Sequence, residues 1–260
     1  SSANLNVGDK VSIHDLFYGM MLPSGNDAAH TIAVNTSRYL YGKSLSDNEA
    51  VEKFMELCNS KLLEIGAYNT NFSGPDGYHH DDHYTTAYDL AKISCYAMKN
   101  KDFREIVGTK KIRIPFTTRN TVRLLINKNK MLNQFDGATG IKTGFTKKAG
   151  RCLVSSAIKN GMELICVVLN CPPMFEKSKE LLTEKFNSYE NVKILESDNI
   201  IGFTNCNGEN IPLIIKKDIV LPVDSSEKDK IRIEYNYPNK IDKIEDFEKE
   251  VGLVKIYCEN

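Results

Sequence analysis

The sequence lacks the features that mark several large protein classes. Lys plus Arg and Asp plus Glu both number 34, so the net charge is zero and no broad positive surface for nucleic acid is expected. No apolar run approaches the roughly 20 residues needed to span a bilayer. The chain opens on Ser1, where an initiator Met or a signal peptide would stand, so we expect an N-terminus cut by processing or truncation.

Paired cysteines are also lacking. The seven cysteines are scattered singly, without the spacing of a zinc site or the density of a disulfide scaffold. We therefore expect no metal and predict that most of these residues are buried, inert thiols. Free thiols favour a reducing compartment, which conflicts with the location inferred below unless the organism does not use disulfides outside the cell.

The composition is that of an ordinary folded protein. Of the 260 residues, 41% are apolar and 26% are charged, and this length suits one substantial domain and a small one. We predict domains at residues 1–195 and 196–260. The second is expected to be β-rich, because short strand patterns follow residue 196, namely 211–215, 219–223, 231–237 and 251–257.

Capping residues and hydrophobic periodicity predict the main elements of the larger domain. Asn160-Gly161 separates two β-rich runs, at 152–159 and 162–169, which indicates a hairpin with a type I′ turn. Residues 67–84 are rich in Asn, Gly, Asp and His and are expected to form a long ordered loop. The other expectations are helices at 12–22, 26–42, 46–66, 86–98 and 175–189 and strands at 110–116 and 139–146.

Two short motifs carry possible chemistry. Ser24-Gly25-Asn26 lies between two predicted helices, and Lys142-Thr143-Gly144 lies on a predicted strand. These are the contexts of two of the three active-site motifs of serine penicillin-binding proteins and β-lactamases. Either triplet alone would occur by chance in roughly 3% of chains this long. A helix cap at Ser24, an exposed strand lysine at Lys142 and a bulge at Gly144 are the alternatives.

The sequence around these motifs resembles the low-molecular-mass D-alanyl-D-alanine carboxypeptidases. The resemblance covers about residues 5 to 190 closely and the tail more loosely. It implies an α/β fold of the α+β type: a β-lactamase/transpeptidase-like antiparallel sheet flanked by helices, with a small C-terminal β-rich domain. The segments that carry it are 8–16, 24–29, 69–72, 83–91, 140–146 and 149–150.

The resemblance implies an extracytoplasmic serine peptidase that removes the terminal D-alanine of peptidoglycan stem pentapeptides through an acyl-enzyme. It implies no cofactor, β-lactams as suicide substrates, and membrane contact only through a segment not present in this chain. No nucleic-acid partner is expected, because the positive and negative charges balance. One alternative is a non-catalytic peptidoglycan-binding pseudoenzyme. A β-lactamase is the other, and the Gly25 position, where that class usually has Asp, disfavours it.

The resemblance also assigns roles to single residues. The Ser-Gly-Asn residues relay a proton and orient substrate, and the lysine polarises that network, so we expect Ser24 and Lys142 to approach closely in space. The strand residues hold the substrate's carboxylate, leave room for its backbone and supply a backbone N–H to the oxyanion. The predicted catalytic residues are Ser24, Asn26 and Lys142, and the predicted substrate-binding residues are Thr143, Gly144 and Phe145.

The family's nucleophile belongs to a Ser-x-x-Lys motif upstream of the segment that starts at Gly8. The one literal match here, Ser156 with Lys159, lies on a predicted strand, where residues three apart point to opposite faces. We therefore predict no nucleophile in this chain and expect a fragment whose sheet has an uncovered edge. A second departure is Met174 beside Phe175, where many relatives have an arginine.

Three histidines and two aspartates cluster in the predicted loop, at positions 79 to 83. His and Asp are common metal ligands, but the loop context favours a solvated polar segment over a metal site.

The purified 260-residue chain is expected to form no stable acyl adduct with a β-lactam, because covalent capture needs a serine hydroxyl paired with a lysine base. Ser24 is not expected to replace that serine, since we identify no second base behind it. Intact-protein mass spectrometry after incubation with a β-lactam measures the adduct directly. A stoichiometric mass increase mapped to Ser24 or Ser156 would contradict this prediction.

Overall fold

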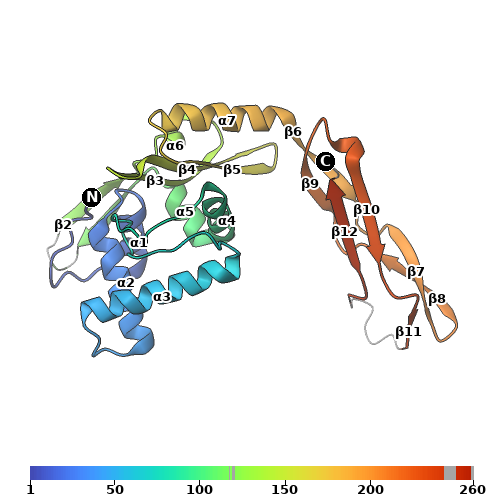
Figure 1. Cartoon of the computed structure of the whole chain (residues 1–260), viewed down its shortest axis with the longest axis horizontal. Coiled ribbons are helices and arrows are strands. Elements are labelled where there is room, and N and C mark those ends of the chain that lie inside the picture. Colours follow the sequence, from blue (N-terminus) through green and yellow to red (C-terminus); the bar gives the residue numbers. More distant parts are fainter. Residues whose placement is uncertain (117, 119–120, 243–249, 259–260) are drawn as a thin grey trace. The chain divides into compact units, whose positions relative to one another are not determined.

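The computed structural model describes residues 1–116, 118, 121–242 and 250–258 (Figure 1). The chain divides into two compact units. Unit 1 comprises residues 1–159 and 163–183, and unit 2 comprises residues 160–162 and 184–260. The domain limits expected from the sequence stay a prediction.

Side-chain caps start several helices of unit 1, including two that begin close to where the sequence predicts them. The Ser12 hydroxyl accepts a hydrogen bond from the backbone N–H of Asp15, and Ser46 forms a complete capping box with Glu49. Gly66, with φ 80°, ends the third helix in the left-handed conformation that glycine tolerates best. The helices are α1 (Ile13–Met21), α2 (Asn26–Tyr41), α3 (Asp47–Ile65), α4 (Ala87–Ala97), α5 (Lys101–Gly108), α6 (Met131–Gln134) and α7 (Met174–Ser188).

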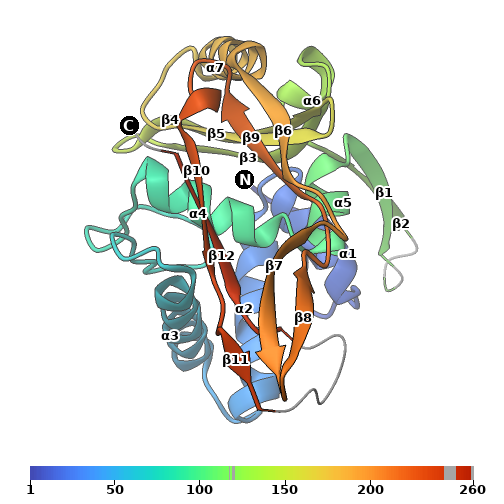
Figure 2. The same cartoon turned by 90° about the vertical axis from the view of Figure 1, so that its right-hand side faces the viewer.

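A three-stranded sheet in the order β3-β4-β5 forms the centre of unit 1. Its strands are β3 (Ala138–Thr146), β4 (Gly150–Lys159) and β5 (Met162–Val168). The β4–β5 connection has positive φ at both Asn160 and Gly161, 50° and 74°, as the predicted type I′ turn requires. Figures 1 and 2 show α7 on one face of this sheet and α4 and α5 on the other. The predicted antiparallel sheet flanked by helices is confirmed.

A separate antiparallel hairpin pairs β1 (Lys111–Phe116) with β2 (Thr121–Ile126). Its inner face packs Ile114 and Leu125, each 1% exposed, against Tyr18 and Leu22 of the α1 region. Strand β1 matches the sequence-based prediction, whereas β2 and the short helices α5 and α6 were not predicted.

The loop at residues 67–84 is held in place by a buried carboxylate. Asp89, 1% exposed in α4, accepts hydrogen bonds from the backbone N–H of Asn69 and the hydroxyl of Thr70, at 2.7 and 2.8 Å. An isolated bridge between Asn71 and Tyr84 closes the base of the loop. The loop is ordered as expected.

Unit 2 is built from short strands, which confirms the expected β-rich tail. Its strands form three small sheets, β6-β9, β11-β7-β8 and β10-β12. The strands are β6 (Tyr189–Leu195), β7 (Ile200–Cys206), β8 (Glu209–Ile214), β9 (Ile219–Asp224), β10 (Ile231–Asn236), β11 (Lys240–Ile241) and β12 (Leu253–Cys258), with a 3-10 turn at Lys228–Lys230.

The prediction for the cysteines is partly wrong. All seven are free thiols, but only Cys166 and Cys206 are buried, and Cys95 and Cys258 are exposed. Within the described part of the chain, no helix is both long enough and apolar enough to cross a membrane.

An ion pair between α5 and β5 is expected to stabilise unit 1. Arg104 donates two hydrogen bonds to Glu163, at 2.7 and 2.6 Å, and a third to the carbonyl of Met98 at 3.0 Å. Glu163→Gln should lower the free energy of unfolding by about 1–2 kcal/mol, because charge-assisted bidentate pairs exceed ordinary surface pairs. The matched control Glu64→Gln, in an exposed pair with Lys61, should cost under about 0.5 kcal/mol. Equal effects in urea denaturation would contradict this ranking.

Candidate active site

The turn between α1 and α2 presents Ser24 in a left-handed backbone conformation, with φ 61°. This conformation costs a non-glycine residue roughly 1 kcal/mol or more, so the surroundings must enforce it. The next residue, Gly25, is buried, and a Cβ there would lie 2.6 Å from the carbonyl oxygen of Gly19 and 2.8 Å from the backbone nitrogen of Ala3. Only glycine therefore fits at the centre of the turn.

The Asp27 carboxylate fixes the chain segment that crowds this turn. Its oxygens accept hydrogen bonds from the Ser2 hydroxyl and the backbone N–H groups of Ala3 and Leu5, at 2.7, 2.7 and 3.0 Å. Burial opposes the charge, but these hydrogen bonds together hold the pKa of Asp27 below its usual value. Asp27 thus ties residues 2–5 to the start of α2.

Lys142 of β3 reaches the turn across 118 residues of sequence. Its Nζ donates hydrogen bonds to the Ser24 hydroxyl oxygen at 2.8 Å and to the Thr143 carbonyl at 2.7 Å. The expected approach of these two motifs is therefore observed. Asn26 is the first residue of α2, so the third predicted catalytic residue belongs to the same turn.

Burial lowers the pKa of Lys142 to about 8, and the positive charge of Lys128 acts in the same direction. A lysine with such a pKa exists in both charged and neutral forms near neutral pH. Next to a hydroxyl at hydrogen-bond distance, it can either donate or accept a proton.

The lowered pKa of Lys142 also makes the stability of the fold depend on pH. The unfolded chain holds this proton up to a higher pH than the folded chain does. The contribution of Lys142 to the free energy of unfolding therefore rises as pH increases from about 8 towards the ordinary lysine pKa of 10.5.

The predicted substrate-binding residues follow Lys142 along β3. Thr143 is partly buried, whereas Gly144 and Phe145 are exposed, and the Phe145 ring lies 5.5 Å from the Arg151 guanidinium. A Cβ on Gly144 would meet only Cys152, at 3.8 Å, among the described residues. Packing within the protein therefore does not require glycine at position 144. The absence of a side chain there leaves space beside the strand.

The Ser156 and Lys159 match does not form a catalytic pair. Ser156 is fully buried in β4, and its hydroxyl lies 2.7 Å from that of Thr139. Lys159 instead lies over the ring of Phe135, 4.6 Å from its centre. The strand expected there is confirmed, and Met174 begins α7 as a buried residue.

The histidine-rich loop shows structural contacts. His83 stacks on Phe72 at 5.5 Å and accepts a hydrogen bond from the backbone N–H of Ser73, and burial lowers its pKa. His79 and His80 are exposed. No cluster of three or more potential metal ligands occurs among the residues that the structure describes.

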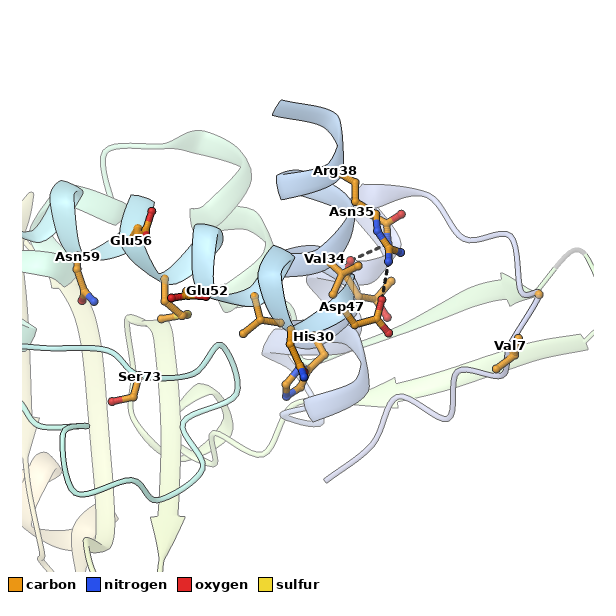
Figure 3. A pocket seen from close by; sticks show the side chains of 15 residues that line it. Val7, His30, Val34, Asn35, Arg38, Asp47, Glu52, Glu56, Asn59 and Ser73 are labelled. Carbon is orange, nitrogen blue, oxygen red and sulfur yellow. Dashed lines mark hydrogen bonds and ion pairs between the residues drawn. The ribbon is translucent and has the colours of Figure 1, made fainter. Parts of the chain in front are cut away.

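A groove of about 890 Å³ lies elsewhere in unit 1, between α2 and α3 (Figure 3). Within it, His30 lies 3.5 Å from Asp76, and Arg38 forms an ion pair with Asp47 at 2.7 Å. It contains neither Ser24 nor Lys142. We therefore place the candidate active site at the Ser24 turn and not in the groove.

Comparison with solved structures shows that the fold is that of the DD-peptidases. The crystal structure of the Streptomyces K15 DD-transpeptidase is 35% identical, with a TM-score of 0.64, and the match covers 71% of this chain and 71% of that one. The D-alanyl-D-alanine carboxypeptidase DacD from Francisella tularensis matches 99% of this chain and 73% of that one with a TM-score of 0.71, but at 24% identity it shows the fold alone.

Family models define the class more closely. One described as D-alanyl-D-alanine carboxypeptidase matches residues 1–172, and another, the C-terminal domain of penicillin-binding protein 5, matches residues 189–260. The chain belongs to the D-alanyl-D-alanine carboxypeptidase family of low-molecular-mass penicillin-binding proteins, which confirms the resemblance.

Curated relatives agree with this assignment. The D-alanyl-D-alanine carboxypeptidase of Streptomyces sp. (strain K15) is 38% identical over 65% of this chain, and DacF of Bacillus subtilis is 30% identical over 72% of it. The matches span 58% and 46% of those proteins' lengths. The chain therefore spans about half the length of the curated relatives it matches.

Two residues of the site were not identified from the sequence. Lys128 follows β2 and contacts the Ser1 hydroxyl, and its backbone N–H donates to the Leu22 carbonyl at 3.1 Å. Asp27 directly follows the Ser-Gly-Asn motif, which was its only sequence signal. Both residues make contacts with segments distant in sequence, and no local sequence pattern predicts such contacts.

Replacing Lys128 by alanine should raise the pKa of Lys142, because removing a nearby positive charge stabilises the protonated amine. The matched control is Lys130→Ala, which removes a lysine whose Nζ lies 5.9 Å from the centre of the Phe175 ring. An NMR titration of isotope-labelled lysine side chains measures both variants. A Lys142 titration unchanged in Lys128→Ala, or shifted equally by the control, would contradict the assignment.

Proposed function

We propose that this chain is the substrate-orienting and proton-transferring part of a serine D-alanyl-D-alanine carboxypeptidase that acts on peptidoglycan stem pentapeptides. The observation that carries the proposal is the 2.8 Å contact between Lys142 Nζ and the Ser24 hydroxyl. This contact joins two of the family's motifs in one site. A metal or cofactor has no role in the proposed reaction.

The proposed reaction forms and then hydrolyses an acyl-enzyme. A serine in a Ser-x-x-Lys helix, in a longer form of the protein, attacks the carbonyl carbon of the penultimate D-alanine, and the terminal D-alanine leaves as the amine. Ser24 passes a proton towards that amine, and Lys142 holds the Ser24 hydroxyl in position. Water then attacks the ester and releases the shortened peptide.

The remaining predicted residues bind the substrate. Thr143 helps hold the terminal carboxylate, and Asn26 orients the peptide. The backbone N–H of Phe145 stabilises the tetrahedral oxyanion, a contribution typically worth a few kcal/mol. The open space beside Gly144 accommodates the peptide backbone along the edge of β3.

The partners and location follow from the same proposal. The peptidoglycan stem peptide is the substrate, and β-lactams acylate the same serine of the longer form. Peptidoglycan lies outside the cytoplasm, so we place the protein in the cell envelope. The zero net charge gives no support to a nucleic-acid partner.

In a longer form that includes a Ser-x-x-Lys helix, Lys142→Ala should slow acylation by a β-lactam by about a hundredfold or more. The matched control Lys159→Ala removes the other lysine of a Ser-x-x-Lys match and should change the rate little. Stopped-flow measurement of acylation rates compares the two. A larger loss in Lys159→Ala would overturn the proposed site.

A further inference from the structure

The segment that leads into the candidate active site is strongly basic in a chain of zero net charge. No Asp or Glu occurs between residues 106 and 135, and the segment includes the whole β1–β2 hairpin. A local excess of positive charge attracts anionic groups even where the whole protein is neutral. Its basic residues are Lys110, Lys111, Arg113, Arg119, Arg123, Lys128 and Lys130.

The outer face of the hairpin carries an apolar stripe next to a basic one. Val122, Leu124 and Ile126 of β2 are 65%, 49% and 60% exposed, although they alternate with the buried Leu125 side of the strand. Three large aliphatic side chains on one exposed strand face are unusual unless something covers them.

The basic stripe comes from β1. Lys111 pairs in register with Ile126, and Arg113 pairs with Leu124, so these residues share the outer face. Both are exposed, and neither has an acidic partner among the residues that the structure describes. We call these five residues, Lys111, Arg113, Val122, Leu124 and Ile126, the hairpin face.

The hairpin face is continuous with the candidate active site. Lys128 lies two residues after Ile126, and its side chain contacts the Ser1 hydroxyl. Its backbone N–H donates a hydrogen bond to the carbonyl of Leu22, two residues before Ser24. Along a strand, Lys111 and Arg113 lie about 7 and 13 Å from the level of Lys128. Measured from the level of Lys128, an extended peptide reaches the level of Lys111 in about two residues and that of Arg113 in about four.

We propose that the hairpin face binds the upstream part of the peptide substrate, with Lys111 and Arg113 contacting its carboxylate and the aliphatic stripe contacting its alkyl groups. This inference rests on the proposed function and specifies its substrate as an anionic stem peptide. The ligand must carry both an anionic group and alkyl groups, because the basic stripe of β1 and the aliphatic stripe of β2 lie side by side. Continuity with the Ser24 site favours the substrate over a membrane surface.

The test compares two stem pentapeptides ending in D-Ala-D-Ala, one with a free upstream glutamate carboxylate and one with that carboxylate amidated. Calorimetry with the 260-residue chain at low ionic strength should show roughly fivefold tighter binding of the free acid. High salt should abolish the difference, because exposed charges are screened. This comparison needs no variant, and equal affinities would overturn the inference.

Variants assign the effect to the hairpin face. In Lys111→Glu/Arg113→Glu the free acid should lose its advantage, whereas the control Lys99→Glu/Lys101→Glu, an equal charge change at exposed positions outside the face, should keep it. Leu124→Ser should weaken both pentapeptides to the same extent. An advantage that persists in Lys111→Glu/Arg113→Glu would overturn the inference.

Two further measurements separate this inference from the proposed function and from its main alternative. A short acyl-D-Ala-D-Ala that binds, with pentapeptides no tighter, would support the site and reject the hairpin face. Failure of every peptide to bind would contradict the proposed function itself. Binding to phosphatidylglycerol vesicles that is lost in Lys111→Glu/Arg113→Glu, with pentapeptide affinity unchanged, would replace the peptide by a membrane surface.

Discussion

The Asp27 carboxylate is the constraint on which the geometry of the candidate site depends. It gathers the backbone of residues 2–5 against the first turn of α2, and Ala3 then lies so close to Gly25 that no side chain fits. That crowding holds the turn in the conformation that gives Ser24 its positive φ. The partly buried Asp27 carboxylate and its hydrogen-bond donors thus hold the α1–α2 turn in the conformation that presents the Ser24 hydroxyl.

The position of Lys142 balances two opposing effects. Burial penalises its positive charge, and Lys128 adds repulsion, yet its hydrogen bonds to Ser24 and the Thr143 carbonyl keep the amine at the site. The pKa of the Lys142 amine is therefore lowered, and a lowered pKa is appropriate for a group that supports proton transfer. The β3–β4 register fixes where this lysine stands, because Lys142 pairs with Val154 next to the buried Leu153.

Local signals in the sequence account for the longer helices and the central hairpin, because caps such as Ser46 with Glu49 and turns such as Asn160-Gly161 act within a few residues. Strand β2 was missed because its apolar residues lie on both faces, which hides the alternation expected of a half-buried strand. The family resemblance indicated Ser24 and Lys142. It could not indicate the contacts of Asp27 and Lys128, which join residues more than 20 positions apart in sequence.

The exposed aliphatic residues of strand β2 are not needed for folding. The inner face of the β1–β2 hairpin already supplies the packing that the fold needs, through Ile114 and Leu125 against α1. Polar residues at the outer positions of β2 would keep that packing and would lower the tendency to associate with other chains. The groove between α2 and α3 differs, because its arginine, Arg38, forms an ion pair with Asp47 within the fold. On the hairpin face, an exposed aliphatic stripe lies beside cations that have no acidic partner in the described part of the chain, and a ligand explains this arrangement better than folding does.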